Sequence, residues 1–282
     1  MQSVILGTAQ WGLDYGATNP GGRLTDESIL EIADVARARG IRRLDTAPGY
    51  GDAEARIGAV APGFGVQTKV SASGQPLSHL LSSVESSLAS TGRHVLDALL
   101  VHDWASLESW AQEPVARAVA GLKEAGLVLA VGVSAYEEAD LASAVEAFDS
   151  LDLVQVPVSV LDQRLTRSPS LAEVRERGGR IQARSILLQG AAVAGVEHPV
   201  FGTHPDVARL RESGSPLSLC LGFVASLHWV DELVLAVTSG FELAQLMGRL
   251  EEPVTGVDWP ALASSDPWLV DPRQWTAPTR EG

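Results

Sequence analysis

The fold follows from one stretch of the chain, Ile41-Arg42-Arg43-Leu44-Asp45-Thr46-Ala47-Pro48-Gly49-Tyr50-Gly51. Its first five residues predict a short strand that ends on a carboxylate. The Pro-Gly pair predicts a turn that brings the tyrosine in front of a helix. The strands predicted at residues 64–69 and 98–102 end in the same way, on Lys69 and His102. Ionisable side chains at the ends of successive apolar strands indicate a catalytic cluster, and we interpret the rest of the chain as its scaffold.

Strands and helices alternate outward from this stretch at a spacing of roughly 25–35 residues, which is typical of parallel βαβ units. We predict strands at residues 3–8, 41–45, 64–69, 98–102, 128–133, 153–156, 180–185 and 232–237. We predict helices between Thr25 and Gly40 and at residues 53–57, 77–88, 107–125, 137–148, 171–177, 217–227 and 241–250. The segment 191–216 is rich in Gly, Pro and His and is predicted to be irregular.

These eight units predict a closed (β/α)8 TIM barrel, an α/β fold of typically about 250 residues, as a single domain over residues 1–282. An open doubly wound sheet is the competing topology. That sheet would place a Gly-x-Gly-x-x-Gly phosphate turn after its first strand, which Gly7 and Gly12 do not form. The C-terminal tail, residues 253–282, carries three tryptophans among prolines. We expect this tail to pack across one face of the barrel.

The composition is that of a globular protein, with 45% apolar and 20% charged residues. Lysine and arginine number 21 and aspartate and glutamate 35, which gives a net charge of −14. This charge repels nucleic acid and anionic membranes, so we expect a small-molecule ligand and neither of those partners. The single cysteine, Cys220, cannot form an internal disulfide. With no visible secretion signal or transmembrane run, we expect a cytoplasmic protein.

The strand ends of a parallel barrel open on one face, so Asp45, Lys69 and His102 are expected on one rim with Tyr50 beside them. A lysine ammonium stabilises the phenolate that remains when a tyrosine gives up its proton, and a carboxylate holds the ammonium in place. A histidine orients a carbonyl oxygen. Together these groups can protonate an oxygen whose carbon receives a hydride. Any one of the four alone is more often structural, and it is their clustering that favours a site.

The motifs around these residues follow one another in a specific order. They are Leu6-Gly7-Thr8 with Gly12, Leu44-Asp45-Thr46-Ala47-x-x-Tyr50-Gly51-x-x-Glu54-x-x-Ile57-Gly58, Thr68-Lys69, Leu100-Val101-His102, Gly132-Val133-Ser134, Gln155 and Ser185-x-x-x-Gln189-Gly190. In this order and spacing the chain resembles the aldo-keto reductases, from residue 4 to about residue 250. The resemblance implies a barrel that binds NADPH without a Rossmann turn and reduces an aldehyde or ketone. It also implies a tetrad of Asp45, Tyr50, Lys69 and His102, with Tyr50 as the general acid.

The resemblance further implies a set of cofactor contacts. They fall on Ser134, Gln155, Arg184, Ser185, Leu187, Gln189, Gly190, Thr238, Ser239 and Glu242. Ala135 stands where the family has asparagine, and Arg184 stands where a tyrosine stacks on the nicotinamide. After the last strand, hydroxyls and a helix N-terminus are available for the 2′-phosphate, but no basic residue occurs before Arg249. We therefore expect NADPH with NADH as the alternative, and a preference for NADPH of no more than about 100-fold.

Two tryptophans that follow strands, Trp11 and Trp104, are predicted to wall the substrate pocket. No metal site is predicted, since His198 and His204 are isolated and no cysteine or carboxylate pattern supports zinc. Two other functions stay open. One is a proton-transfer enzyme, catalysing elimination or epimerisation on the same tetrad without redox turnover. The other is a non-enzymatic barrel that senses a nucleotide.

Overall fold

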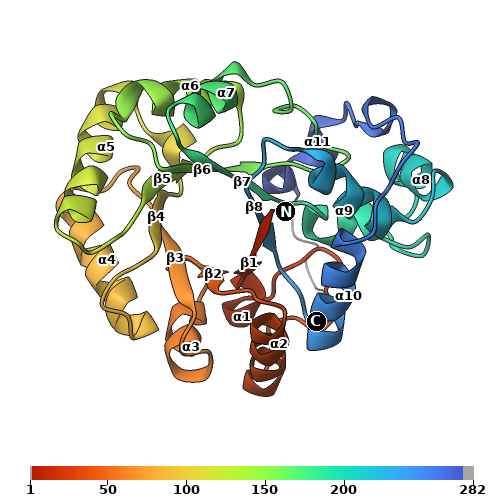
Figure 1. Cartoon of the computed structure of the whole chain (residues 1–282), viewed down its shortest axis with the longest axis horizontal. Helices are drawn as coiled ribbons and strands as arrows, with labels where there is room; N and C mark the ends of the chain where they lie inside the picture. The colour runs from red at the N-terminus through yellow and green to blue at the C-terminus, as the bar shows by residue number, and fades with distance from the viewer. Residues whose placement is uncertain (1, 276–282) are drawn as a thin grey trace.

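Eight parallel strands close into a barrel in the computed structural model, which describes residues 2–275. The strands are β1 (Ser3–Gly7), β2 (Arg43–Asp45), β3 (Gly65–Val70), β4 (Ala98–Val101), β5 (Val131–Ser134), β6 (Leu153–Pro157), β7 (Arg180–Arg184) and β8 (Glu232–Leu235). Each pairs with its neighbours in chain order, and β1 pairs with β8 to close the ring. Figure 1 looks along the barrel and shows helices on its outside. The closed (β/α)8 prediction is confirmed, and the open doubly wound sheet is excluded.

The covering helices are α2 (Asp26–Ala38), α3 (Ala53–Val60), α4 (Ser78–Thr91), α5 (Ser109–Glu124), α6 (Glu138–Ala147), α7 (Pro169–Glu176), α8 (Pro205–Glu212), α9 (Pro216–Ser226) and α10 (Gly240–Leu250). Short turns of helix complete the chain: α1 (Ala9–Gly12), α11 (Pro267–Val270) and three-ten turns at Trp104–Ser106, Leu188–Val193, Pro260–Leu262 and Pro272–Gln274. The prediction of an irregular segment at 191–216 is wrong over α8. A proline opens α8 and His204 caps it, so a helix forms there despite the breaker-rich composition.

The helix α2 illustrates how local sequence builds these units. The Thr25 hydroxyl accepts a hydrogen bond from the Ser28 backbone N–H and so caps the helix start. The apolar stripe of α2 is fully buried against the barrel, on Ile29, Ile32, Ala33 and Ala36. Gly40 follows the helix with a φ of +79°, a backbone conformation that residues other than glycine rarely adopt. The strand predicted from residue 41 begins only at Arg43, because the first two residues complete the turn.

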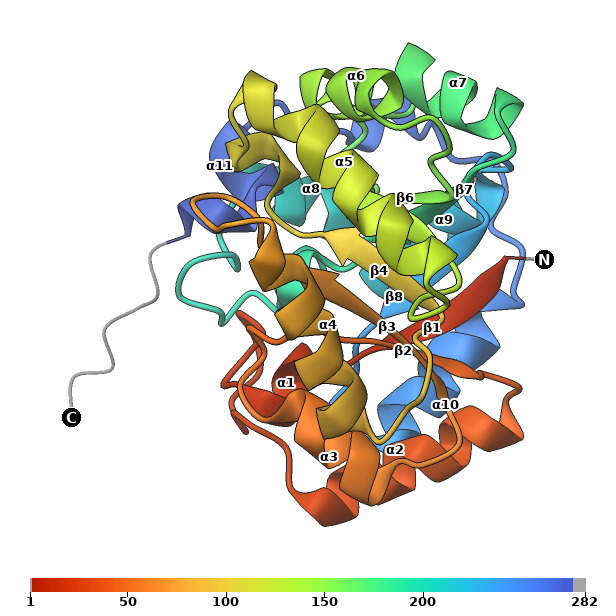
Figure 2. The ribbon, with the colours of Figure 1, turned by 90° about the vertical axis from the view of Figure 1, so that its left-hand side faces the viewer.

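The part of the tail that the structure describes, residues 253–275, packs against the barrel. Residues 276–282 of the predicted tail lie outside the described residues. Trp259, Trp268 and Trp275 pack against the core. The rings of Trp268 and Trp275 contact Phe201, and the Trp275 Nε1–H donates to the Trp268 carbonyl. Figure 2 shows α11 on the side where the strands end, opposite the start of β1. The tail therefore contributes to the face that carries the strand-end residues.

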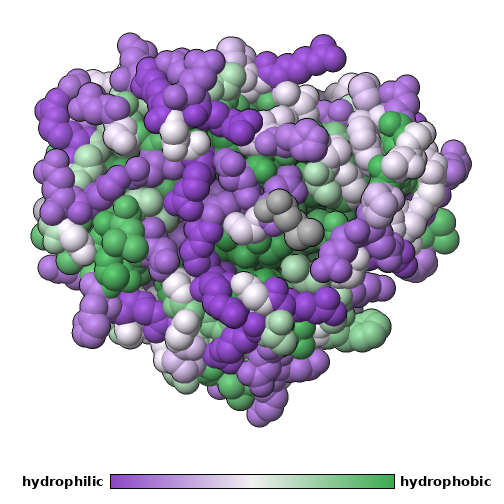
Figure 3. All heavy atoms as spheres, viewed as in Figure 1, coloured by the Kyte–Doolittle hydropathy of each residue, from purple (hydrophilic) through white to green (hydrophobic). Residues whose placement is uncertain are grey.

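The inside of the barrel is unusually polar. Side chains alternate between the two faces of a strand, so Gln67 and Lys69 of β3 share the inner face. Asp45 and Gln182 are also buried inside the barrel. A separate small apolar cluster consists of Ala98, Leu100, Ala130 and Leu153. The main hydrophobic core lies between the outer face of the barrel and the helices. Figure 3 shows the face where the strands begin, on which hydrophilic residues surround an apolar hollow.

Candidate active site

The four residues predicted as a tetrad lie together at the strand ends. Asp45 ends β2, Lys69 is the fifth residue of β3, and His102 follows β4 directly. The Lys69 Nζ lies 2.6 Å from Asp45 Oδ2 and 3.0 Å from the Thr46 carbonyl oxygen, and it reaches the Tyr50 hydroxyl at 3.5 Å. The Tyr50 and His102 rings meet edge to face, with centroids 6.3 Å apart. The lysine thus links the buried carboxylate to the phenol.

The loop that carries Tyr50 is held by close backbone packing. A Cβ at Gly12 would lie 1.8 Å from the Tyr50 carbonyl oxygen, so α1 can approach this loop only because residue 12 is glycine. The Tyr50 N–H donates to the Ala47 carbonyl at 2.9 Å, and the Ala53 N–H donates to the Tyr50 carbonyl at 3.1 Å. The Pro-Gly turn therefore presents the phenol from a fixed backbone, directly ahead of α3.

Burial and charge set the protonation states of the two basic groups. Burial lowers the pKa of Lys69, but the charge of Asp45 and the Tyr50 hydroxyl outweigh burial, and the pKa is raised overall. The pKa of His102 falls to about 4, first because burial disfavours the imidazolium and then because Lys69 and Arg184 repel it. Near neutral pH the site therefore holds a lysine ammonium and a neutral imidazole.

A polar column of Asp45, Gln67, Gln155, Gln182 and Glu232 runs through the barrel beneath the tetrad. Asp45 Oδ1 accepts from the side-chain amides of Gln67 at 2.6 Å and Gln155 at 2.9 Å. Gln67 and Gln182 exchange two hydrogen bonds, at 2.8 and 2.7 Å, and Gln182 Nε2 also donates to Glu232 Oε2 at 2.7 Å. Both oxygens of Asp45 are therefore fixed, one by the column and one by Lys69.

The column ends at the face where the strands begin. Glu232 there forms ion pairs with Arg43 and Arg180. Burial raises the pKa of the Glu232 carboxyl, but hydrogen bonds and charge from Arg43 and Gln182 outweigh burial and lower the pKa overall. The carboxylate is thus ionised and compensated, which satisfies the last polar group of the column.

A cavity of about 530 Å³ opens above the tetrad and runs along the ends of β7 and β8. Most of the predicted cofactor residues line it together with the tetrad: Ser134, Gln155, Arg184, Ser185, Leu187, Gln189, Gly190, Thr238 and Glu242. Ser239 is not among the lining residues, and its hydroxyl instead caps α10 by accepting from the Glu242 N–H at 3.1 Å.

The two predicted substrate tryptophans lie elsewhere. Trp11 and Trp104 are fully buried in the core and do not line the cavity. The Trp104 Nε1–H donates to the Ser143 hydroxyl at 2.9 Å, and its ring packs on Phe148. The structure thus gives both indoles packing roles, since the chain after β1 and after β4 turns each ring towards the helices.

The cavity wall at β5 to β7 suits a nicotinamide dinucleotide. Ser134 and Gln155 are partners across β5 and β6 and both face the cavity. Ser185 and Gln189 have φ values of +59° and +54°, a strained conformation that collects at functional sites. At Gly190 a Cβ would lie 1.8 Å from the Thr18 hydroxyl, so the loop after β1 closes on the β7 loop only over glycine. Gln10 Oε1, buried at the wall, has no hydrogen-bond partner within residues 2–275 and can accept from a ligand.

The far end of the cavity, at the start of α10, is less suited to a 2′-phosphate. The Thr238 N–H and hydroxyl both donate to Glu242 Oε2, at 2.7 and 2.9 Å. These are two of the donors that the sequence offered to a phosphate, and a carboxylate already uses them. Arg249, the nearest basic residue along the chain, forms an ion pair with Glu252. Only the helix N-terminus is left to attract a phosphate there.

Several lining residues escaped the sequence analysis. Tyr15 and Asn19 come from the glycine-rich loop after β1, Tyr136 follows β5, and Arg273 comes from the tail. The glycines at 16, 21 and 22 were a signal for a functional loop. No local pattern identified Arg273, because its place at the cavity depends on how the tail crosses the barrel.

Neither a metal site nor a membrane span is found in the described part of the chain. Across residues 2–275 no three His, Cys, Asp or Glu side chains gather closely enough to hold a metal ion. His204 caps α8 and pairs with Asp266, and His198 packs on Phe201. No helix between residues 2 and 275 has both the length and the apolar character needed to cross a membrane.

Comparison with known proteins gives a consistent result. Residues 3–247 match the profile described as the Aldo/keto reductase family. An aldo-keto reductase from Bacillus halodurans, solved in its holo form, is 16% identical with a TM-score of 0.74, covering 96% of this chain and 94% of that one. A putative aldo-keto reductase from Pseudomonas aeruginosa is 23% identical with a TM-score of 0.67, covering 88% of both chains.

A glycerol dehydrogenase from Gluconobacter oxydans is also similar in structure. It is 17% identical with a TM-score of 0.68, covering 92% of this chain and 89% of that one. Comparison with curated protein sequences finds no match. At these identities the similar structures bear on the fold alone, whereas the profile covers most of the chain and the motifs around the cavity.

Proposed function

Because the chain belongs to the aldo/keto reductase family, we propose that it uses NAD(P)H to reduce an aldehyde or ketone to an alcohol, with Tyr50 as the general acid. The observation that carries the proposal is the placement of Lys69 Nζ between Asp45 Oδ2 at 2.6 Å and the Tyr50 hydroxyl at 3.5 Å, on the wall of a cavity. That arrangement supplies a proton and stabilises the oxyanion left behind.

Each residue of the tetrad has a distinct task in this proposal. The bound dinucleotide supplies the hydride for the carbonyl carbon. Tyr50 donates its proton to the carbonyl oxygen, and the Lys69 ammonium stabilises the resulting phenolate. Asp45, fixed by the polar column, holds the ammonium in place. His102 is neutral, so it can donate an N–H to the carbonyl oxygen and orient it without placing a second cation beside the nicotinamide.

The residues along the wall account for the cofactor. Ser134 and Gln155 would hold the carboxamide, and the Ser185–Gly190 loop would follow the pyrophosphate. The turn at Thr238 would meet the adenosine end. Since Glu242 uses the Thr238 donors, a 2′-phosphate gains little there. We infer that NADPH is preferred over NADH by no more than about 100-fold, or roughly 2.7 kcal/mol.

Titration with NADPH and NADH tests the proposal, with tryptophan fluorescence as the readout. Saturable binding of at least one nucleotide, followed by its oxidation in the presence of an aldehyde, is expected. Binding without oxidation of NAD(P)H by any aldehyde or ketone would favour the nucleotide-sensing barrel. Failure to bind either nucleotide would favour proton transfer on the same tetrad, such as elimination or epimerisation.

A further inference from the structure

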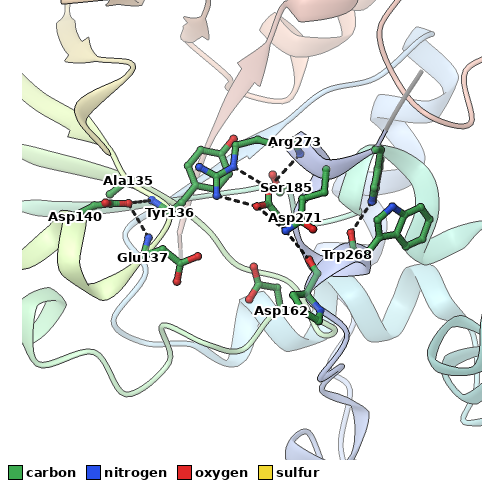
Figure 4. A network of polar contacts seen from close by, with 12 residues as sticks. Ala135, Tyr136, Glu137, Asp140, Asp162, Ser185, Trp268, Asp271 and Arg273 are labelled. Atoms are coloured by element: carbon green, nitrogen blue, oxygen red, sulfur yellow. Dashed lines mark hydrogen bonds and ion pairs between the residues drawn. The ribbon is translucent and has the colours of Figure 1, made fainter. Parts of the chain in front are cut away.

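The aromatic ring of Tyr136, at the cavity wall, has a guanidinium group on each face. The Arg184 Cζ lies 4.0 Å from the ring centroid, and the Arg273 Cζ lies 3.5 Å from it. Both distances are short enough that the two groups fit only on opposite faces of the ring. Arg184 ends β7, while Arg273 comes from the tail, and all three side chains line the cavity that contains the tetrad. In Figure 4 the tail brings Arg273 and Asp271 towards Tyr136 and Ser185.

The two arginines differ in how their charges are compensated. Arg273 Nε and Nη2 each donate to one oxygen of Asp271, both at 2.8 Å, which is a two-point ion pair. The guanidinium of Arg184 has no carboxylate within 4.0 Å over residues 2–275. Its polar contacts are long, 3.3 Å to the Ser185 hydroxyl and 3.5 Å to the Ala135 carbonyl oxygen. The cation of Arg184 is therefore uncompensated, although it lies at a cavity wall.

The Arg184 guanidinium lies over the Tyr136 ring, and its two long polar contacts leave most of its N–H groups unused. A guanidinium has five donors in its plane, and a planar fork of this kind matches a carboxylate or a phosphate. The charge also extends to the tetrad, since it contributes to lowering the pKa of His102. In a protein of net charge −14, an anion can be attracted only by a local cation of this sort.

We propose that Arg184 binds an anionic group, a carboxylate or a phosphate, on the carbonyl substrate. This inference rests on the proposed reductase function and narrows its substrate class to aldehydes or ketones that carry such a group. Arg273, neutralised by Asp271, holds Tyr136 from the other face and so keeps the Arg184 fork in place. The alternative is that Arg184 contacts the dinucleotide, and the experiment separates the two.

The test compares pairs of substrates that differ in charge. One pair is 4-carboxybenzaldehyde and 4-carbamoylbenzaldehyde, and the other is glyceraldehyde 3-phosphate and glyceraldehyde. The ratio of kcat/KM values within a pair measures recognition of the anion, and the two pairs distinguish carboxylate from phosphate. We expect the wild type to favour the anionic member of at least one pair by about 10-fold or more, the effect of one charged hydrogen bond or two.

Arg184→Met keeps an unbranched apolar side chain in place of the aliphatic stem and removes the fork. This change should lower the anionic-to-neutral ratio by about 10- to 100-fold, mainly through the KM of the anionic substrate. Arg184→Lys should recover only part of the ratio, because an ammonium lacks the planar fork. Arg273→Met is the matched comparison, and its effect on the ratio should be smaller because Asp271 already neutralises that group.

Equilibrium binding makes the test independent of turnover. Benzoate should bind the wild type more tightly than benzamide by calorimetry, and Arg184→Met should remove the difference. A wild-type ratio near one with no benzoate preference would overturn the proposal. So would an Arg184→Met variant that weakens NADH binding and leaves both ratios unchanged, since Arg184 would then serve the cofactor. If Arg273→Met lowered the anionic-to-neutral ratio as much as Arg184→Met does, both arginines would bind the anion and the proposal for Arg184 alone would be wrong.

The proposed function can fail separately. If no carbonyl compound is reduced but benzoate still binds through Arg184, the anion site stands and the reductase proposal falls. If the neutral aldehydes are reduced with no anion preference, the reductase proposal stands and the anion site falls.

Discussion

The two ends of the cavity differ in the charged groups that line them. At the tetrad end, Lys69, Arg184 and Arg273 all line the wall. At the α10 end the polar lining residues include Thr238 and Glu242, and the Glu242 carboxylate accepts hydrogen bonds from both Thr238 donors. The cavity therefore concentrates its cations at the tetrad end, and the α10 end carries little positive charge.

The physical reason lies in desolvation. A buried ammonium such as Lys69 persists only with a partner, and the polar column fixes that partner from below. The α10 end is an ordinary capped helix start, in which Ser239 and Glu242 satisfy backbone donors. The side chains at the tetrad end are therefore held by specific partners and should be sensitive to substitution. The α10 end should accept substitutions more easily.

The largest expected effect tests whether chemistry belongs to the tetrad end alone. Tyr50→Phe removes the proposed acid, so kcat should fall by at least about 100-fold while the Kd for NADH changes little. Single-turnover kinetics and fluorescence titration measure the two quantities. Tyr15→Phe removes a hydroxyl from the same cavity and should cost much less. Near-normal turnover in Tyr50→Phe would take this residue out of the acid role.

The next effect tests how the tetrad is held. Asp45→Asn removes the charge that keeps Lys69 in place, so kcat should fall by about 10-fold or more, and the pH profile of reduction should shift with it. Asp149→Asn, at an exposed position after α6, makes the same charge change and should alter neither. If Asp45→Asn retained both the rate and the profile, the carboxylate would be only a strand-end hydrogen-bond acceptor.

A change at the other end of the cavity should alter cofactor preference and not the chemical step. Ser239→Arg introduces a cation at the start of α10 and should raise the preference for NADPH over NADH by roughly 10-fold, with kcat nearly unchanged. Dissociation constants at low and moderate salt give the measurement, and Ser82→Arg, exposed on α4, controls for net charge. A wild-type preference far above about 100-fold would mean that another basic residue reaches the 2′-phosphate.

The last effect is on the pH dependence of stability, and it depends on the burial of His102. The pKa of His102 is about 4 in the folded protein and about 6.5 when unfolded, so only the unfolded chain takes up a proton between these values. Stability from this group is therefore complete above pH 6.5 and is lost as the pH falls towards 4. His102→Gln should reduce that loss by roughly 2 kcal/mol at pH 5 in urea unfolding.

His94→Gln, at an exposed position, provides the comparison for this last measurement. It should leave the acid-side loss of stability as it is in the wild type. An equal flattening in both variants would mean that the loss does not arise from the burial of His102.

The barrel was predictable from sequence because each strand repeats the same signal, a short apolar run followed by a helix with its own start and stop. The tetrad was predictable for a related reason. Parallel strands bring their ends to one rim, so Asp45, Lys69 and His102 were near one another once the topology was chosen. Local sequence, combined with one topological rule, determined both.

What escaped prediction depends on packing between distant segments. Arg273 reaches the cavity because the rings of Trp268 and Trp275 anchor the tail on Phe201, and no local pattern encodes that route. Trp11 and Trp104 were expected in the pocket wall because each follows a strand, but their rings lie in the core. The polar column could have been predicted, because its glutamines are polar residues at inner positions of otherwise apolar strands.

The reciprocal amide pair of Gln67 and Gln182 constrains how this sequence can drift. A leucine at either position alone would leave an amide N–H of the other without its partner, at about 1–3 kcal/mol, out of a total stability of roughly 5–15 kcal/mol. Replacing both amides with apolar side chains would also remove a donor from Asp45 Oδ1 and the donor to Glu232 Oε2, so the double change is costly as well. Two positions 115 residues apart are therefore linked, and relatives of this chain should keep both amides or change the neighbouring column residues with them.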